Sequence, residues 1–274
     1  MQENIEQNSQ NIGLIAGNGR FPFLAAQGIK NAGKRVVCVA LKEEADPSLA
    51  QVCDEIYFIS IGKFQKILDA FKNSGVKEVI MAGQVKHVTI YAAITMDWRA
   101  IKVMASLINK KTDTMLETFG RELEKEQMRL ISSTAFLKEF MAKKGLIAGK
   151  PLSQTEQADA EFGFKTAKAV AGLDIGQTVV VKDTSVLAVE SVEGTDECIR
   201  RAAKLGGKGI VVCKVAKPNQ DFRFDVPVIG PRTIETLKEN KARAMIIEAD
   251  STLILDADET AQKAKQANVT IIAL

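Results

Sequence analysis

Histidine and cysteine are scarce in this chain of 274 residues, which contains one histidine and four cysteines. The cysteines, at positions 38, 53, 198 and 213, lie far apart and form no C-x-x-C pair. A zinc site of ordinary spacing would therefore find almost no ligands. Nothing around His87 forms a nucleophile–base pair, so we expect this histidine to be non-catalytic. These scarcities argue against a structural metal and against Ser/His catalysis, and they indicate a reducing compartment.

Aromatic residues make up only 5% of the chain, and the net charge is only +3. So small a charge does not gather nucleic acid, and so few aromatics do not build a stacking platform for single strands. The longest uncharged apolar stretch, residues 87–96, is half as long as the roughly twenty residues that a transmembrane helix needs. The polar first residues contain no apolar signal-peptide core. We expect a cytoplasmic protein that binds no nucleic acid.

The first half of the chain alternates short apolar runs with helical patterns. The alternation predicts right-handed crossovers and a parallel sheet, so we expect an α/β fold with an N-terminal Rossmann-like domain at residues 1–148. The predicted strands cover residues 12–16, 35–41, 56–59 and 79–82, and the predicted helices cover 22–32 and 64–75.

Residues 97–144 have helical spacing throughout. Near their end, Phe136, Leu137, Phe140 and Met141 form an apolar stripe beside lysines. Such a stripe is more typical of a buried helix face than of a surface helix. Peripheral contact with the inner membrane is the alternative that its lysines leave open.

The second half begins after the clearest break signals in the chain, at residues 149–154. Two apolar runs, 178–181 and 186–189, are separated by four polar residues and predict a hairpin. Helices near 155–171, from 195 and from 231 then alternate with strands at 209–213, 244–248 and 269–273. We expect residues 149–274 to form a C-terminal α/β domain with a mixed sheet.

Glycines follow two of the predicted strands. Gly17-Asn18-Gly19-Arg20 follows the first strand and leads into a helix, where backbone N–H groups can approach a phosphate. A dinucleotide fingerprint requires a third glycine where this chain has Pro22, so a nicotinamide site has weak support. Gly83-Gln84 follows a later strand, at the edge where parallel sheets bind ligands. Ordinary tight turns are the alternative for both motifs.

Two polar segments of the second half could also carry chemistry. Within residues 190–196, two acids and a hydroxyl (Glu193, Asp196 and Thr195) surround Gly194. They could hold a sugar or a hydrated cation, or Thr195 could only cap a helix. The densest cluster, residues 214–232, combines basic and acidic side chains on a backbone stiffened by prolines. A pyrophosphate ester needs such cations, together with a carboxylate that holds magnesium or orients water. A solvated loop with weak surface ion pairs is the alternative.

Taken together and in order, several motifs resemble those of the UDP-2,3-diacylglucosamine pyrophosphatases of the LpxI family. The matching segments are residues 12–19, 82–85, 173–177, 187–190, 193–196, 214–218 and 223–227. The resemblance implies two α/β domains, a cytoplasmic enzyme of Gram-negative lipid A biosynthesis and a possible homodimer. The implied reaction uses Mg²⁺ to hydrolyse UDP-2,3-diacylglucosamine at the α-phosphate, giving UMP and 2,3-diacylglucosamine 1-phosphate (lipid X).

Asp225 falls on the essential carboxylate of that family, so the resemblance implies that it is the catalytic residue and a metal ligand. The family's binding contacts fall on Arg20, Gln84, Val85, Thr112, Gly176 and Thr195. With the motifs above, the expected substrate-binding residues are Gly17, Asn18, Gly19, Arg20, Gly83, Gln84, Val85, Thr112, Asp113, Gly176, Gln177, Glu193, Gly194, Thr195, Lys217 and Arg223. The alternatives are a nucleotide-sugar or lipid-binding protein that does not hydrolyse its ligand and a nicotinamide-dependent reductase.

Overall fold

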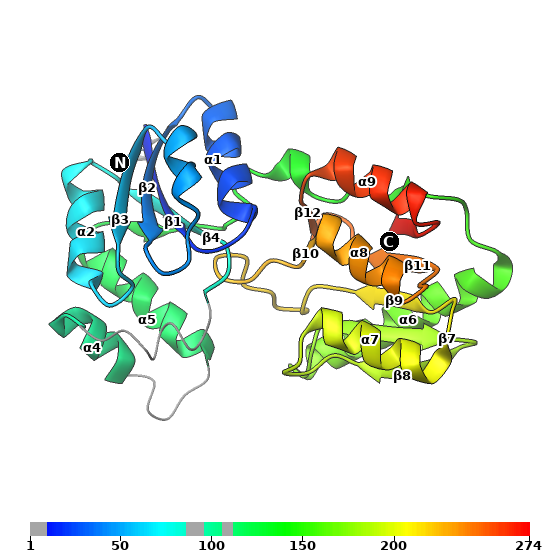
Figure 1. The fold of residues 1–274 in the computed structure, drawn as a ribbon. Helices are drawn as coiled ribbons and strands as arrows, with labels where there is room; N and C mark the ends of the chain where they lie inside the picture. Colours follow the sequence, from blue (N-terminus) through cyan, green and yellow to red (C-terminus); the bar gives the residue numbers. More distant parts are fainter. Residues whose placement is uncertain (1–9, 86–95, 106–111) are drawn as a thin grey trace, which may run out of the picture. The chain divides into compact units, whose positions relative to one another are not determined.

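The computed structural model describes residues 10–85, 96–105 and 112–274, and it describes side chains for all of these except 103–105 and 112–117. His87 lies outside the described residues. The chain divides into two compact units (Figure 1). The first unit contains Met1–Leu137 and Phe222–Phe224, and the second contains Lys138–Asp221 and Asp225–Leu274. No helix in the described part of the chain has the length and apolar character needed to cross a bilayer.

The first unit is built on a five-stranded sheet in the order β3-β2-β1-β4-β5, and all its strand pairs are parallel. The inner strands are almost wholly buried because helices cover both faces, and this burial explains their near-continuous apolar sequences. The strands are β1 (Asn11–Ala16), β2 (Arg35–Leu41), β3 (Glu55–Ile59), β4 (Glu78–Ala82) and β5 (Arg129–Leu130).

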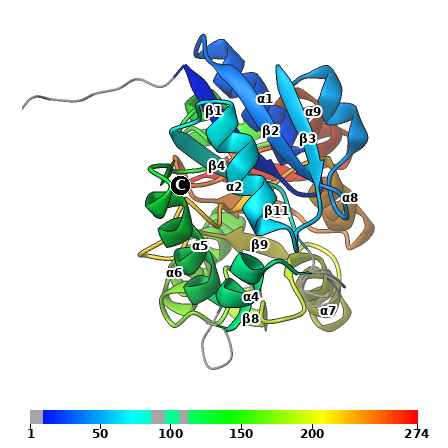
Figure 2. The ribbon, with the colours of Figure 1, turned by 90° about the vertical axis from the view of Figure 1, so that its left-hand side faces the viewer.

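Helix α1 (Phe21–Asn31) packs on one face of this sheet, and helices α2 (Phe64–Asn73) and α5 (Thr112–Lys125) pack on the other (Figure 2). Successive side chains of β1 therefore pack on opposite faces of the sheet, in two different hydrophobic cores. Leu14 lies with Ala25 and Ile29 of α1, whereas Ile15 lies with Phe71 of α2. Between β2 and β3 runs a short 3-10 helix, η1 (Pro47–Gln51).

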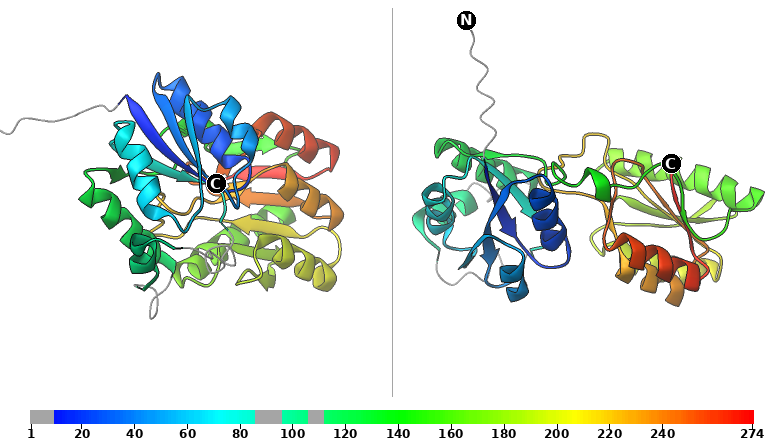
Figure 3. Two further views of the ribbon diagram at one scale, coloured as in Figure 1. Left: turned by 60° about the vertical axis from the view of Figure 1, so that its left-hand side comes forward. Right: turned by 90° about the horizontal axis from the view of Figure 1, so that it is seen from above.

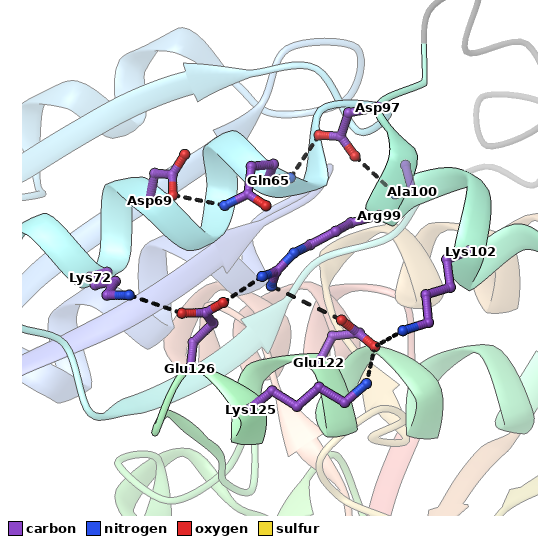
Figure 4. A network of polar contacts seen from close by, with 10 residues as sticks. All are labelled: Gln65, Asp69, Lys72, Asp97, Arg99, Ala100, Lys102, Glu122, Lys125 and Glu126. Carbon is purple, nitrogen blue, oxygen red and sulfur yellow. Dashed lines mark hydrogen bonds and ion pairs between the residues drawn. The ribbon is translucent and has the colours of Figure 1, made fainter.

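Helix α4 (Trp98–Ala105) is held to α2 and α5 by a network of ion pairs (Figure 4). Arg99 of α4 donates to Glu126 at 2.6 Å, and its guanidinium lies 4.0 Å from the carboxylate of Glu122. Glu122 is only 3% exposed. Burial opposes its ionisation, but Lys125 and Lys102 lower its pKa below the usual value. The network therefore keeps a buried charge ionised by surrounding it with cations.

The helical expectation for residues 97–144 is wrong beyond Lys125. Residues 129–130 instead form β5, and Ser132–Thr134 make local hydrogen bonds that compete with a helix. The predicted stripe of Phe136, Leu137, Phe140 and Met141 consequently does not exist as a helix face, and Leu137 is fully buried. The alternative of a membrane contact through this stripe therefore loses its basis.

The second unit contains a six-stranded sheet in the order β6-β13-β11-β9-β7-β8. Strands β9, β11 and β13 are parallel, while β6, β7 and β8 pair antiparallel with their neighbours, so the predicted mixed sheet and the α/β fold class are confirmed. The strands are β6 (Gly145–Ala148), β7 (Thr178–Lys182), β8 (Ser185–Val189), β9 (Val211–Lys214), β11 (Ala244–Ile247) and β13 (Thr270–Ala273); β10 (Val228–Ile229) and β12 (Leu253–Ile254) form a separate parallel pair.

Helix α6 (Gln154–Gly172) covers one face of this sheet, and α7 (Thr195–Gly206), α8 (Pro231–Glu239) and α9 (Ala257–Gln266) cover the other (Figure 3). A short 3-10 helix, η2 (Lys138–Phe140), precedes β6. α6 starts at a capping box between Ser153 and Glu156. Gly163 in α6 allows close packing, because a Cβ there would lie 2.6 Å from the sulfur of Cys213 in β9.

The β7–β8 hairpin turns through Asp183 and Thr184, which both have positive φ, as a type I′ turn requires. The buried carboxylate of Asp159 on α6 accepts hydrogen bonds from the backbone N–H groups of both turn residues, at 3.1 and 2.6 Å. The turn is thereby fastened to the helix. This carboxylate offsets the strain of two left-handed residues that are not glycine.

Replacing Asp159 by Ala should therefore lower the free energy of unfolding by about 1.5–3 kcal/mol, because two charge-assisted hydrogen bonds are lost. Urea denaturation followed by circular dichroism measures this change. Glu161→Ala is the matched control, since Glu161 is an exposed carboxylate on the same helix. A loss for Asp159→Ala no larger than that of the control would contradict this role.

Candidate functional site

In the first unit, the turn after β1 pairs with the segment that follows β4. The N–H of Gly17 donates to the carbonyl of Ala82 at 2.8 Å. Asn18 and Gln84 exchange two backbone hydrogen bonds of 2.8 and 3.0 Å, which form an isolated antiparallel bridge. The two glycine motifs of the sequence are thus one structural element at the carboxyl edge of the sheet.

Glycine is required at two of these positions because the backbones approach closely. A Cβ on Gly17 would lie 2.5 Å from the carbonyl oxygen of Gln84, and a Cβ on Gly83 would lie 2.7 Å from that of Asn18. Gly19 is different: its φ is +98°, and the space around its Cα is open. The amides of Gly17 and Asn18 are engaged with backbone carbonyls, so they cannot also form the phosphate cradle suggested by the motif.

The side chains of Asn18, Arg20 and Gln84 are exposed on this element. Arg20 precedes α1, and its carbonyl accepts from the N–H of Phe23 at 3.1 Å. Its guanidinium lies 5.1 Å from the centre of the Phe23 ring. Pro22 has no N–H, so the first turn of α1 has one backbone donor fewer than that of an ordinary helix.

Residues 222–224 pack in the first unit beside the end of β4. The N–H of Ser133 donates to the carbonyl of Phe222 at 2.8 Å. Its buried hydroxyl lies 2.6 Å from the carbonyl oxygen of Met81 and 3.0 Å from that of Arg223. The guanidinium of Arg223 lies over the ring of Phe224, 5.0 Å from its centre. Ser133 therefore brings predicted residue Arg223 to the edge of the sheet that carries Gln84.

In the second unit, a chain of hydrogen bonds joins the carboxyl end of β9 to the start of α7. Lys214, the last residue of β9, donates to the hydroxyl of Thr195 at 3.0 Å. Thr195 donates in turn to Glu190 at 2.9 Å, and its oxygen lies 3.4 Å from that of Thr178. The antiparallel pairing of β7 with β9 places Thr178 opposite Lys214. An ammonium group, two hydroxyls and a carboxylate thus converge at one end of the sheet.

The glycines around this cluster have distinct roles. A Cβ on Gly176 would lie 2.0 Å from the carbonyl oxygen of Glu190, so no side chain fits there. Gly194 precedes α7 with φ +80°. Glu193 accepts hydrogen bonds from Arg201 and from the N–H of Ser191, and Arg201 lowers the pKa of its carboxyl. The carboxylate of Glu193 thereby stabilises the turn.

Asp225 is exposed, and two amide side chains hold one of its carboxylate oxygens. Gln177, just before β7, donates to Oδ2 at 2.7 Å, and Gln220 donates to the same oxygen at 2.8 Å. The other oxygen, Oδ1, accepts no hydrogen bond from the described part of the chain. The backbone N–H of Asp225 donates to the carbonyl of Asp221 at 3.1 Å, which closes the base of this loop.

The loop that follows β9 is fastened at its start. Glu248 accepts from the N–H of Ala216 at 2.8 Å and pairs with Lys168, whose ammonium also donates to the carbonyl of Ala216. Lys217 pairs with Asp174 at 2.5 Å. These contacts give the segment that leads to Asp225 a defined path.

The two cysteines of the second unit are poor nucleophiles. Burial raises the pKa of Cys198 to about 12 and also raises that of Cys213, so both thiols stay protonated near neutral pH. Within the described residues, no three His, Cys, Asp or Glu side chains gather as a ready-made metal site. The polar side chains described above are carboxylates, amides, hydroxyls and cations.

The structure sorts the predicted site residues into two groups. Gly17, Asn18, Gly19, Arg20, Gly83, Gln84, Val85 and Arg223 belong to the first unit; Gly176, Gln177, Glu193, Gly194, Thr195, Lys217 and Asp225 belong to the second. Thr112 and Asp113 begin α5, and their side chains lie outside what the structure describes. Two polar residues at these sites, Ser133 and Gln220, were missed because a single serine or glutamine in a loop forms no recognisable pattern.

Comparisons with known proteins agree along the chain. Residues 11–140 match the LpxI N-terminal domain, and residues 143–272 match the LpxI C-terminal domain. The UDP-2,3-diacylglucosamine pyrophosphatase LpxI of Caulobacter vibrioides is 33% identical over 258 residues, which cover 90% of this chain and 91% of that protein.

Solved structures resemble the chain only weakly. The biotin carboxylase domain of a thermophilic 2-oxoglutarate carboxylase gives a TM-score of 0.29 at 15% identity, covering 73% of this chain and 34% of that one. A Campylobacter jejuni biotin carboxylase complex gives 0.29 at 14%, covering 84% and 42%. The chain spans less than half of either structure, and such scores say nothing about its fold. The two domain matches and the curated relative, in contrast, cover nearly the whole chain, and they show that it belongs to the LpxI family.

Proposed function

We propose that this protein hydrolyses UDP-2,3-diacylglucosamine at the α-phosphate, giving UMP and 2,3-diacylglucosamine 1-phosphate, the lipid X of lipid A biosynthesis. The observation that carries the proposal is Asp225, an exposed carboxylate with one oxygen held by Gln177 and Gln220 and the other directed to no protein donor in the described chain. It lies in the segment that matches the LpxI C-terminal domain. The named activity of the Caulobacter vibrioides relative supplies the substrate.

In this mechanism the Oδ1 of Asp225 either orients the attacking water, by accepting a hydrogen bond from it, or holds the magnesium ion. Attack in line with the leaving sugar phosphate breaks the bond between the α-phosphorus and the bridging oxygen. Phosphoryl transfer of this kind depends chiefly on positioning and on screening of charge, so it needs little proton transfer from the protein. Lys214 supplies a fixed positive charge, held by Thr195, for the phosphate oxygens.

Mg²⁺ is the cofactor that we expect with this reaction. Magnesium is usually held by one or two carboxylates, with waters and substrate phosphates as its remaining ligands. Asp225 would hold the ion through Oδ1, because the described residues donate only to its other oxygen. When bound, the ion would screen the charge that develops on the α-phosphate.

A binding protein that does not hydrolyse its ligand is the second candidate, since loops of this kind could hold a nucleotide sugar. A nicotinamide reductase has less support, because Gly17 donates its N–H to Ala82 rather than leaving it for a pyrophosphate. We place the reaction in the cytoplasm.

Incubation with UDP-2,3-diacylglucosamine and Mg²⁺ should release UMP and lipid X, and a chelator should stop the reaction. In water enriched in oxygen-18, mass spectrometry should find the label in UMP, because water attacks the α-phosphorus. Binding without UMP release would favour the second candidate. Label in lipid X would place the attack on the other phosphorus.

Replacing Asp225 by Asn should lower kcat by about 10²–10³-fold or more while the Kd for substrate stays within about threefold, because the lost carboxylate acts on the transition state. Asparagine keeps an oxygen for Gln177 and Gln220, so folding should be preserved. Asp250→Asn is the control, since Asp250 is an exposed aspartate of the same unit. A variant with near-normal kcat would contradict the catalytic role of Asp225.

Replacing Lys214 by Met should raise the KM for substrate by about tenfold, because a phosphate contact of one charge is lost. The measurement is a set of steady-state curves for UMP release. Lys204→Met, on the exposed surface of α7, serves as the control for loss of one charge. Equal KM values for both variants would exclude Lys214 from substrate binding.

A further inference from the structure

Gln220 uses its whole side chain within the loop that carries Asp225. Its Oε1 accepts from the backbone N–H of Lys217 at 2.9 Å. Its Nε2 lies 2.9 Å from the carbonyl oxygen of Asp225 and 2.8 Å from the Oδ2 of the same residue. One amide group therefore spans the loop and contacts both the backbone and the carboxylate of Asp225.

A second amide reaches the same carboxylate from another element. Gln177 precedes β7 and donates to Oδ2 at 2.7 Å. Its own backbone carbonyl accepts from the N–H of Val215, directly after β9, so its position is set by the sheet. Two donors from separate directions meet at Oδ2 and fix the orientation of a side chain that is otherwise exposed.

The choice of an amide has a chemical consequence. A lysine or arginine at position 220 would also donate to Asp225, but it would neutralise the carboxylate that it holds. A neutral amide orients the carboxylate without adding a charge. The negative charge of Asp225 therefore stays available at Oδ1, the oxygen to which the described residues donate nothing.

We propose that Gln220 is a positioning residue for the reaction: its amide holds the Asp225 carboxylate so that Oδ1 faces the reacting water or cation. The inference rests on the proposed function of Asp225. Gln220 itself touches neither substrate nor water in this role. Gln220 raises kcat in this role. Without its hydrogen bond, an exposed aspartate rotates among several side-chain conformations, and only some of them are productive.

Two variants separate this role from simple support of the loop. Gln220→Glu keeps an oxygen that accepts from the N–H of Lys217, but it removes the donor to Asp225 and adds a repelling charge. Gln220→Met has a similar length and removes both the donor and the acceptor without adding charge. If Gln220 acts by holding the Asp225 carboxylate, Gln220→Glu lowers kcat more than Gln220→Met does. If Gln220 acts only by supporting the loop, Gln220→Met lowers kcat more.

We expect Gln220→Glu to lower kcat by about 10- to 100-fold and Gln220→Met by about tenfold, with KM within about threefold for both. Thermal unfolding should place Met as the less stable of the two. The matched control is Gln157→Glu, because Gln157 also donates to a carboxylate, that of Glu161, but on the exposed face of α6.

A kcat within twofold of wild type for Gln220→Glu, or the reverse kcat order, would overturn the inference. If Gln220→Glu fails to fold, Gln220→Met decides alone, and a kcat within twofold then overturns it. Asp225→Asn is assayed in parallel. If that variant keeps its activity, the proposed function of Asp225 is wrong; if it loses activity while both Gln220 variants keep theirs, only the role of Gln220 is wrong.

Discussion

Two amide nitrogens, from Gln177 and Gln220, donate to a single oxygen of Asp225, and the chemistry proposed for this protein depends on that arrangement. Exposed carboxylates are common on protein surfaces, and most of them rotate. In Asp225 the hydrogen bonds to Oδ2 fix the orientation of the carboxylate and therefore the direction in which Oδ1 points. The donors carry no charge, so they hold the carboxylate without neutralising it. Oδ1, to which no described residue donates, can then bind a water or a cation.

The mixed topology of the second sheet makes this arrangement possible. In a purely parallel sheet, only the carboxyl ends of strands would meet at the edge that carries Lys214. Because β7 runs antiparallel to β9, its amino end lies at that edge, and Thr178 comes opposite Lys214. Gln177 is thereby placed beside Val215, at the start of the loop that leads to Asp225. The hairpin turn at Asp183 and Thr184, fastened by Asp159, then directs β8 back toward Glu190 at the same edge.

Much of the fold could be predicted from the sequence, because buried parallel strands and amphipathic helices leave long periodic signals. β5 and β12 could not, since two-residue strands are too short to show a period. The glycine motifs were visible as turns after strands. The backbone bridge between Asn18 and Gln84 was not, because it joins residues 66 positions apart that only the sheet brings together.

The site shows the same division. Asp225 and Thr195 could be chosen as candidates from the family resemblance, and Gln177 lies in a matching segment. Gln220 could not be identified, because its role comes from the path of the loop and not from any local pattern. Glu193 lies in a matching segment too, yet its carboxylate is engaged by Arg201. The family resemblance indicates which positions are candidates for the site. The hydrogen bonds of each side chain show whether it is engaged in the structure of the protein or available to a ligand.

The most direct test of the account is a crystal structure of the Asp225→Asn variant with bound UDP-2,3-diacylglucosamine. We expect the side chain at position 225 to lie within about 5 Å of the α-phosphorus, close enough for one water between them. We also expect the amides of Gln177 and Gln220 still to contact that side chain. A complex in which the α-phosphate binds more than about 10 Å from position 225, beyond reach of a single bridging water, would contradict the central claim.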